Sequence, residues 1–162
     1  MPSFCLMGKI AKKEVKMNGK KVKVSCFNCG QTNNYPLEAE DKKVICGRCH
    51  SPLPRPGDVL EVNPDQAFSL ISRSSLPVLI DFYSHTCPPC QMMAPFLERL
   101  ARRRAGELMV IKIEVDRYPE MAAQFGIQSV PTFAIFHRNS ERGRISGAMP
   151  ETDLALWVAK LA

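Results

Sequence analysis

The chain has 162 residues, of which 45% are hydrophobic and 23% charged, and its formal net charge is +6. This length fits one ordinary domain with a small appendage, and no stretch reaches the roughly 18 uninterrupted apolar residues that a membrane span needs. The N-terminus lacks an apolar segment followed by a small-residue cleavage site. We therefore expect a cytoplasmic protein without membrane association, whose seven cysteines serve as metal ligands or redox catalysts rather than structural bridges.

Residues 1–24 form a basic N-terminal arm with seven lysines and one glutamate. Two alternating runs in this arm flank Asn18-Gly19, a dipeptide that suits a type I′ turn, so the sequence predicts a small hairpin. Surfaces that bind single-stranded nucleic acid commonly combine basic residues with aromatic ones, and no aromatic residues interleave these lysines. We interpret the arm as a solvated extension in preference to a site for nucleic acid or an acidic partner.

Residues 25–51 carry two cysteine pairs of the same spacing, Cys26-x2-Cys29 and Cys46-x2-Cys49. One tight turn presents two sulfurs at about 2.3 Å from a single ion, and two such turns complete a tetrahedron. The segment has few apolar side chains, so a metal would supply most of its folding free energy, which is about 10 kcal/mol in small zinc peptides. We expect a zinc ribbon with one Zn²⁺ on these cysteines; two disulfides or free thiols are the alternative.

Residues 52–57, PLPRPG, are predicted to be a linker because prolines and glycine disfavour both helix and strand. Residues 58–162 then alternate between strand and helix patterns. A continuous apolar run at 78–83, broken only by Asp81, indicates a central strand covered on both faces. The alternation predicts an α/β fold with a mixed sheet between helices. The expected strands are 59–62, 78–83, 109–115, 132–137 and 142–147, and the expected helices are 64–72, 90–104, 119–125 and 152–161.

A third cysteine pair, Cys87 and Cys90, has the same spacing but lies between a strand and a helix. A helix N-terminus directs unsatisfied N–H groups and a positive dipole end at a thiol placed there, which then ionises more readily. Cys87 is therefore the expected nucleophile, and Cys90 the buried thiol that resolves a mixed disulfide. Asp81 should have a raised pKa if it is buried, which suits acid–base work near neutral pH; a half-exposed strand residue is the alternative.

Two separated segments, VLIDFYSHTCPPCQMMAPFLERLA and FGIQSVPTFAIF, resemble the active-site and cis-proline segments of the thioredoxin family. With the cysteine-rich segment, residues 26–162 are similar to the zinc-containing type of thioredoxin. The resemblance implies a thioredoxin fold and a protein-disulfide reductase that acts on disulfide-containing proteins. It also implies an electron donor like thioredoxin reductase, and we expect a monomer.

The resemblance further implies roles for single residues. Asp81 matches the buried carboxylate that assists proton transfer at the resolving thiol, and Lys112 matches a lysine that lies near it. Pro131 matches the cis-proline, and Val130 the residue whose backbone binds an extended substrate. Thr86 stands where most thioredoxins have tryptophan, so this substrate-contacting position offers less apolar surface.

The dipeptide Pro88-Pro89 between the two thiols fixes two φ angles and removes two N–H donors from the neighbourhood of Cys87. A thiolate stabilised mainly by the Cys90 N–H favours a more negative redox potential, by about 30 mV for each 1.4 kcal/mol. Strain at Pro88, which precedes a proline, opposes this effect. Our preferred interpretation is a disulfide reductase; a disulfide isomerase or oxidant, and a ribbon-based partner-binding module or redox holdase, are the alternatives.

Overall fold

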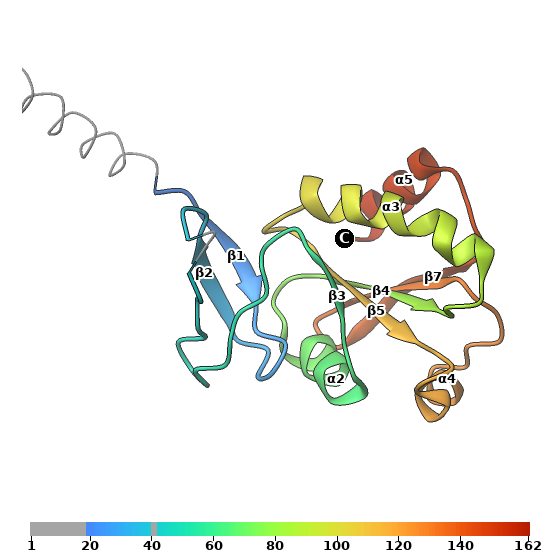
Figure 1. Cartoon of the computed structure of the whole chain (residues 1–162), viewed down its shortest axis with the longest axis horizontal. Helices are drawn as coiled ribbons and strands as arrows, with labels where there is room; N and C mark the ends of the chain where they lie inside the picture. Colours follow the sequence, from blue (N-terminus) through green and yellow to red (C-terminus); the bar gives the residue numbers. More distant parts are fainter. Residues whose placement is uncertain (1–18, 40–41) are drawn as a thin grey trace, which may run out of the picture.

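The computed structural model describes residues 19–39 and 42–162 (Figure 1). Strands β1 (Lys21–Ser25) and β2 (Thr32–Pro36) form an antiparallel two-stranded sheet. The predicted hairpin around Asn18 lies largely outside the described residues. Within them, the strand that follows Gly19 pairs with β2 in the register Val24↔Asn33.

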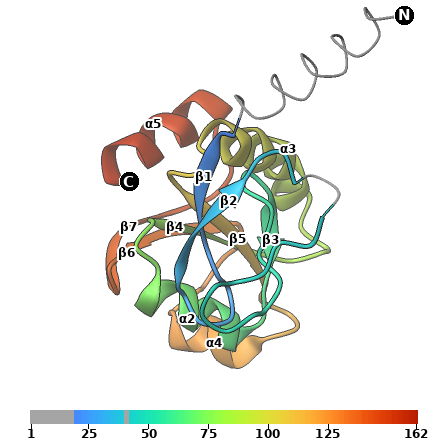
Figure 2. The same cartoon turned by 90° about the vertical axis from the view of Figure 1, so that its left-hand side faces the viewer.

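The larger sheet has five strands in the order β3-β5-β4-β6-β7. β3, β5 and β4 run parallel, whereas β6 and β7 pair antiparallel to their neighbours. Helices α3 and α5 cover one face and α2 and α4 the other, as Figures 1 and 2 show. This arrangement confirms the predicted α/β fold with a mixed sheet between helices. The strands are β3 (Val59–Glu61), β4 (Val78–Tyr83), β5 (Met109–Glu114), β6 (Thr132–His137) and β7 (Ser140–Ser146), and the helices are α2 (Pro64–Arg73), α3 (Pro88–Arg103), α4 (Pro119–Gln124) and α5 (Glu151–Leu161).

β4 is the central strand, and all six of its residues are buried. Alternate side chains enter two different clusters, since Leu79 packs with the residues beneath α3 and α5, and Ile80 with those beneath α2. Asp81 is the charged exception in this strand. Among the described residues, no helix combines the length and apolar character needed to cross a bilayer.

Local sequence signals explain where several elements begin. Asn63 caps α2 through a reciprocal pair of hydrogen bonds with Gln66, at 2.9 and 3.1 Å. α3 begins at Pro88, two residues before the expected start, because prolines in the first turn need no N–H partner. β7 also begins early, because Arg138 and Asn139 both have positive φ, at 53° and 61°, and form a tight two-residue turn from β6.

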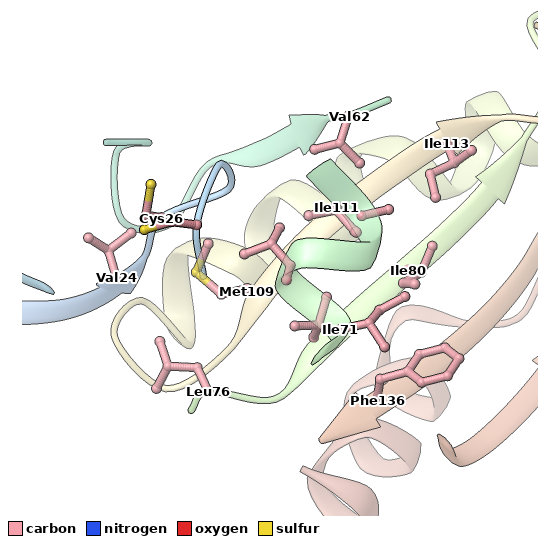
Figure 3. Close-up of a cluster of buried hydrophobic side chains, with 14 of the residues drawn as sticks. Val24, Cys26, Val62, Ile71, Leu76, Ile80, Met109, Ile111, Ile113 and Phe136 are labelled. Atoms are coloured by element: carbon pink, nitrogen blue, oxygen red, sulfur yellow. The ribbon is translucent and has the colours of Figure 1, made fainter. Parts of the chain in front are cut away.

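The cysteine-rich segment (residues 25–51) shares one buried core with the larger sheet. Figure 3 shows Val24 and Cys26 beside Met109 and Leu76, and all four side chains are under 10% exposed. A buried hydrogen bond of 2.6 Å between the hydroxyls of Ser25 and Ser74 joins the two parts. The segment thus lies to one side of the larger sheet, as Figure 1 shows, and is packed against it rather than held by the linker alone.

Gly30 brings the backbone of the cysteine-rich segment close to α2. It has φ of +76°, and a Cβ there would collide with the Cβ of Arg73 and the carbonyl of Ser69 in α2. We predict that Gly30→Ala lowers the free energy of unfolding by about 2 kcal/mol, from backbone strain and the collision together. Urea titration measures the loss. Gly19→Ala is the matched control, because a Cβ at Gly19 meets nothing within 4 Å; equal effects of the two substitutions would contradict the close approach.

Candidate active site and metal centre

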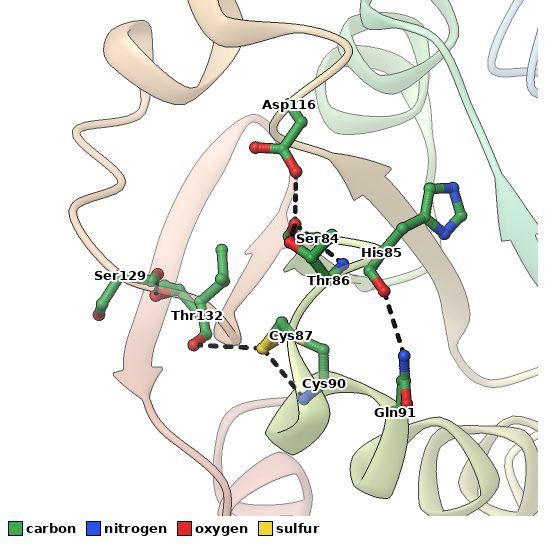
Figure 4. Close-up of a disulfide and its surroundings, with 10 residues drawn as sticks. Ser84, His85, Thr86, Cys87, Cys90, Gln91, Asp116, Ser129 and Thr132 are labelled. Atoms are coloured by element: carbon green, nitrogen blue, oxygen red, sulfur yellow. Dashed lines mark hydrogen bonds between the residues drawn. A yellow bond between two sulfur atoms is a disulfide. The ribbon is translucent and has the colours of Figure 1, made fainter.

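Cys87 is the N-cap residue of α3, and its sulfur accepts a hydrogen bond of 3.2 Å from the Cys90 N–H. The two cysteines form a disulfide, with Cα atoms 5.3 Å apart, at the exposed end of the helix (Figure 4). Pro88 and Pro89 occupy the first helical positions and contribute no N–H. Cys90 is only 5% exposed, whereas Cys87 is partly accessible. An attacking thiol therefore has access to Cys87 and not to Cys90.

The loop from β4 to α3 is fixed by short polar contacts that Figure 4 shows. The Ser84 hydroxyl donates to the Asp116 carboxylate and lies 3.1 Å from the Thr86 hydroxyl. The Gln91 side-chain amide donates to the His85 carbonyl at 3.1 Å. These bonds hold the turn in front of Cys87, while Thr86 itself is exposed beside the disulfide.

The segment before β6 faces the disulfide. The Val130–Pro131 peptide bond is cis, as expected for Pro131, and the Val130 carbonyl oxygen lies 3.7 Å from the Cys87 sulfur. The Thr132 hydroxyl donates to the Ser129 carbonyl at 2.7 Å and fixes this turn. A groove of about 400 Å³ continues from Val130, and α4 and the segment after it supply most of its walls. The groove is lined by Val115, Pro119, Ala122, Ala123, Ile127, Gln128, Ser129 and Val130.

Asp81 is 3% exposed, and within the described residues its Oδ1 has no hydrogen-bond partner. Burial raises the pKa of Asp81 to about 7, against the opposing charge of Lys112 on the adjacent strand. Asp81, Lys112 and Cys90 line the same pocket of about 160 Å³. The buried carboxyl and the buried thiol thus border the same small cavity.

Cys26, Cys29, Cys46 and Cys49 converge on one point, with all four sulfurs within 4.8 Å of one another. The sulfur–sulfur distances are 3.6 Å between Cys26 and Cys49 and 3.7 Å between Cys29 and Cys46. A tetrahedral ion with bonds of about 2.3 Å requires sulfurs about 3.8 Å apart. The predicted cysteine cluster is thus formed, and its dimensions fit a metal ion.

Polar donors surround this cysteine cluster. The Asn28 side-chain amide lies 3.5 Å from the Cys49 sulfur, and the Asn33 side-chain amide 3.5 Å from the Cys46 sulfur. Such N–H groups stabilise thiolates, the form in which cysteine binds metal. Sequence patterns did not point to either asparagine, because their side chains reach the sulfurs only after the two Cys-x2-Cys turns have come together.

Comparison with known proteins agrees with this geometry. The model of the family described as "Thioredoxin" matches residues 58–160. The chain belongs to the thioredoxin family. It is 35% identical to "Thioredoxin C-3" of Corynebacterium nephridii over 135 residues, which cover 83% of this chain and 92% of that protein. It is also 36% identical to the thioredoxin of Haemophilus influenzae over 101 residues, or 62% of this chain and 94% of that protein.

Solved structures show the same relationship for this thioredoxin. Chloroplastic thioredoxin z superposes with a TM-score of 0.60 at 26% identity, covering 64% of this chain and 94% of the other. A mutant thioredoxin from Halobacterium salinarum gives a TM-score of 0.60 at 29% identity, covering 67% of this chain and 94% of the other. The chain is a thiol-disulfide oxidoreductase, and the family to which it belongs reduces protein disulfides. The alignment with thioredoxin C-3 is longer than the family match, so it also includes residues N-terminal to that match.

The buried carboxyl of Asp81 makes stability depend on pH. Below about pH 4 it is protonated in the folded and unfolded chain; between the ordinary value of 3.8 and about 7 only the folded chain retains the proton. We predict that the wild-type free energy of unfolding falls by roughly 3–4 kcal/mol from pH 4 to pH 8 because of this group. Asp81→Asn should lack that component. Urea unfolding at both pH values checks this, and equal pH dependence in the two proteins would contradict it.

Proposed function

We propose that this thioredoxin reduces disulfides in protein substrates, with Cys87 as the nucleophile and Cys90 as the resolving thiol. The observation that carries the proposal is the position of the Cys87 sulfur. It caps the N-terminus of α3, accepts the Cys90 N–H, and lies 3.7 Å from the Val130 carbonyl. Amide and helix dipole together favour the thiolate, which is the attacking form.

In the first step, the Cys87 thiolate attacks one sulfur of the substrate disulfide. A bond forms between the Cys87 sulfur and that atom, the substrate disulfide breaks, and the second substrate sulfur departs as a thiolate that takes a proton from solvent. The substrate backbone would lie along Val130, whose carbonyl flanks the disulfide. The exposed Thr86 and the apolar groove beside Val130 would contact neighbouring side chains.

In the second step, the Cys90 thiol gives its proton to the Asp81 carboxylate and attacks the Cys87 sulfur. The Cys87–Cys90 disulfide forms, and the bond from Cys87 to the substrate breaks. The departing substrate thiolate then takes the proton back from Asp81, directly or through water, so two thiols on the protein become two thiols on the substrate. The shared pocket of Asp81 and Cys90 supports this transfer, and a carboxyl with a pKa of about 7 both accepts and returns a proton near neutral pH. Lys112 would act as a positioning residue through its charge.

The cysteine cluster fits zinc, and we propose that this protein is of the zinc-containing type. Cys26, Cys29, Cys46 and Cys49 would hold one Zn²⁺, which serves a structural purpose because four thiolates leave no open position. The spacing of the sulfurs and the amide donors around them support this assignment. Since Cys26 is also part of the shared core, the metal would stabilise the active-site domain as well.

The two alternative functions, a disulfide isomerase or oxidant and a ribbon-based partner-binding module or holdase, have less support. Within the described residues the Cys90 N–H is the single backbone donor to the Cys87 sulfur, and a sparsely stabilised thiolate favours a reductase over an oxidant or isomerase. A separable partner-binding module or holdase is hard to reconcile with a core that spans both parts. We further propose a cytoplasmic monomer that receives electrons from a donor like thioredoxin reductase, since the cytosol keeps thiols reduced.

Single-cysteine variants test the assignment of roles. With dithiothreitol as reductant, the wild-type protein should accelerate insulin reduction, and Cys87→Ser should reduce the rate to background. Cys90→Ser should attack the substrate but fail to resolve it, and should therefore accumulate a mixed disulfide visible by mass spectrometry. The assignment is wrong if Cys87→Ser also traps substrate, or if the trapped bond in Cys90→Ser joins another cysteine.

Metal analysis tests the zinc site. The purified full chain should contain about one zinc per molecule, and Cys49→Ser should contain much less. We expect this variant to lose roughly 10 °C in Tm, because a loss of about 3 kcal/mol shifts Tm by 2–4 °C per kcal/mol at this size. Cys5→Ser is the matched control, because Cys5 stands outside the three C-x2-C pairs of the sequence, and it should keep both zinc and Tm. Iron in place of zinc, or full metal content in Cys49→Ser, would contradict the assignment.

A further inference from the structure

A row of three charged side chains crosses the sheet under the N-terminal end of α3. The register places Glu61 of β3 opposite Lys112 of β5, and Lys112 opposite Asp81 of β4. Paired positions on adjacent strands point to the same face of the sheet, and neighbouring strands lie about 4.8 Å apart. Lys112 therefore has a carboxylate on each side, one buried and one at the exposed edge strand.

Tyr83 holds Glu61 in this row. Tyr83 follows Asp81 by two positions on β4 and so points to the same face. Its hydroxyl donates to the Glu61 Oε1 at 2.5 Å, and its ring centroid lies 5.1 Å from the Lys112 Nζ. Burial, with the hydrogen bond to Glu61 as a second cause, raises the pKa of Tyr83 above its usual range, so the phenol remains a donor at every working pH.

The other titratable groups around Asp81 leave Lys112 as the cation that acts on it. The His85 Nε2 lies 3.2 Å from a carboxylate oxygen of Glu114, and the side-chain nitrogen and oxygens of His85, Glu61 and Glu114 are all within 4.8 Å of one another. The Lys112 ammonium lowers the Asp81 pKa against the effect of burial. The titratable groups that share the pocket of the Asp81 carboxyl are Tyr83 on β4, Lys112 on β5, His85 in the following loop and Cys90 on α3. Glu61 on β3 and Glu114 on β5 lie farther along the sheet, in register with Lys112 and Tyr83.

We propose that Glu61 is a positioning residue of the active site: held beside Lys112 by Tyr83, it draws the lysine charge away from Asp81 and sets the pH at which Asp81 exchanges a proton with Cys90. This inference rests on the proposed exchange at Cys87 and Cys90. Glu61 touches neither substrate nor sulfur. Its influence passes through Lys112 and through direct repulsion between the two carboxylates, and both effects favour protonated Asp81.

The arrangement has a chemical purpose in the resolving step. Asp81 must be ionised to take the Cys90 proton and protonated to return it, so a midpoint near neutral pH serves both directions. A lysine devoted to Asp81 alone would keep that carboxyl ionised and make the return of the proton harder. Sharing Lys112 with Glu61 keeps the proton available without removing the lysine from the pocket.

The titration of Asp81 in the oxidised full chain tests the proposal directly. The carboxyl carbon of Asp81 is followed by ¹³C NMR between pH 4 and pH 10 in the wild type and in Glu61→Gln. The glutamine keeps an oxygen for the Tyr83 hydroxyl and removes only the charge. We expect the Asp81 midpoint to fall by roughly half a pH unit, the size expected for one charge about 10 Å away near a solvated surface.

Two further variants separate this mechanism from general effects. Glu107→Gln makes the same change of net charge at an exposed residue that pairs with Arg104, and should leave the midpoint unchanged. Tyr83→Phe keeps the ring beside Lys112 but releases Glu61, and should lower the midpoint in the same direction as Glu61→Gln. An unchanged midpoint in Glu61→Gln, or an equal fall in Glu107→Gln, would overturn the proposal.

The titration does not depend on turnover, so the role of Glu61 and the proposed disulfide reduction are tested separately. If the wild type reduces insulin through Cys87 and the midpoint stays fixed in Glu61→Gln, only the role of Glu61 is wrong. If the wild type has no dithiol activity, the proposed function fails whatever the midpoint does. Equal Tm values for the wild type and Glu61→Gln would show that a shifted midpoint reflects charge rather than altered folding.

Discussion

The hydrogen bond from the Cys90 amide to the Cys87 sulfur is the interaction on which the proposed chemistry depends. It requires that α3 begin immediately after Cys87, and the two prolines at the start of the helix ensure this because they suit its first turn and lack donors of their own. The buried strand β4 ends a few residues before Cys87. On the other side of the sulfur lies the carbonyl of Val130, in the loop before β6. The fold therefore sets the reactivity of Cys87 through the position of the N-terminus of α3.

Near this terminus the protein buries a carboxyl group, that of Asp81, in surroundings that disfavour its ionised form. Asp81 is buried without a hydrogen-bond partner on its Oδ1 among the described residues, and its ionised form costs stability. The core on the opposite face of β4, beneath α2, continues into the cysteine-rich segment. A metal bound by that segment would act on the active site through packing, since Cys26 lies in the same cluster as the residues beneath α2.

Much of this was accessible from the sequence, and the exceptions have physical reasons. Apolar periodicity and the cysteine spacings predicted the sheet, the helices and the cysteine cluster, because these patterns are local. The Arg138-Asn139 turn was missed, since arginine is not typical of positions with positive φ. Glu61 and Tyr83 carried no signal at all: their contact joins β3 and β4, which flank β5 only once the sheet has formed. The packing of residues 25–51 against α2 was hidden for the same reason, and a linker rich in proline indicated separation instead.

The most direct test of the account is the pH dependence of alkylation at Cys87 in the reduced protein. With iodoacetamide in limiting time, the account predicts that modification of Cys87 reaches half its maximal rate well below the value of about 8.5 for a free cysteine, while Cys90 remains unmodified. A half-maximal rate at or above that of free cysteine, or equal labelling of Cys87 and Cys90, would contradict it.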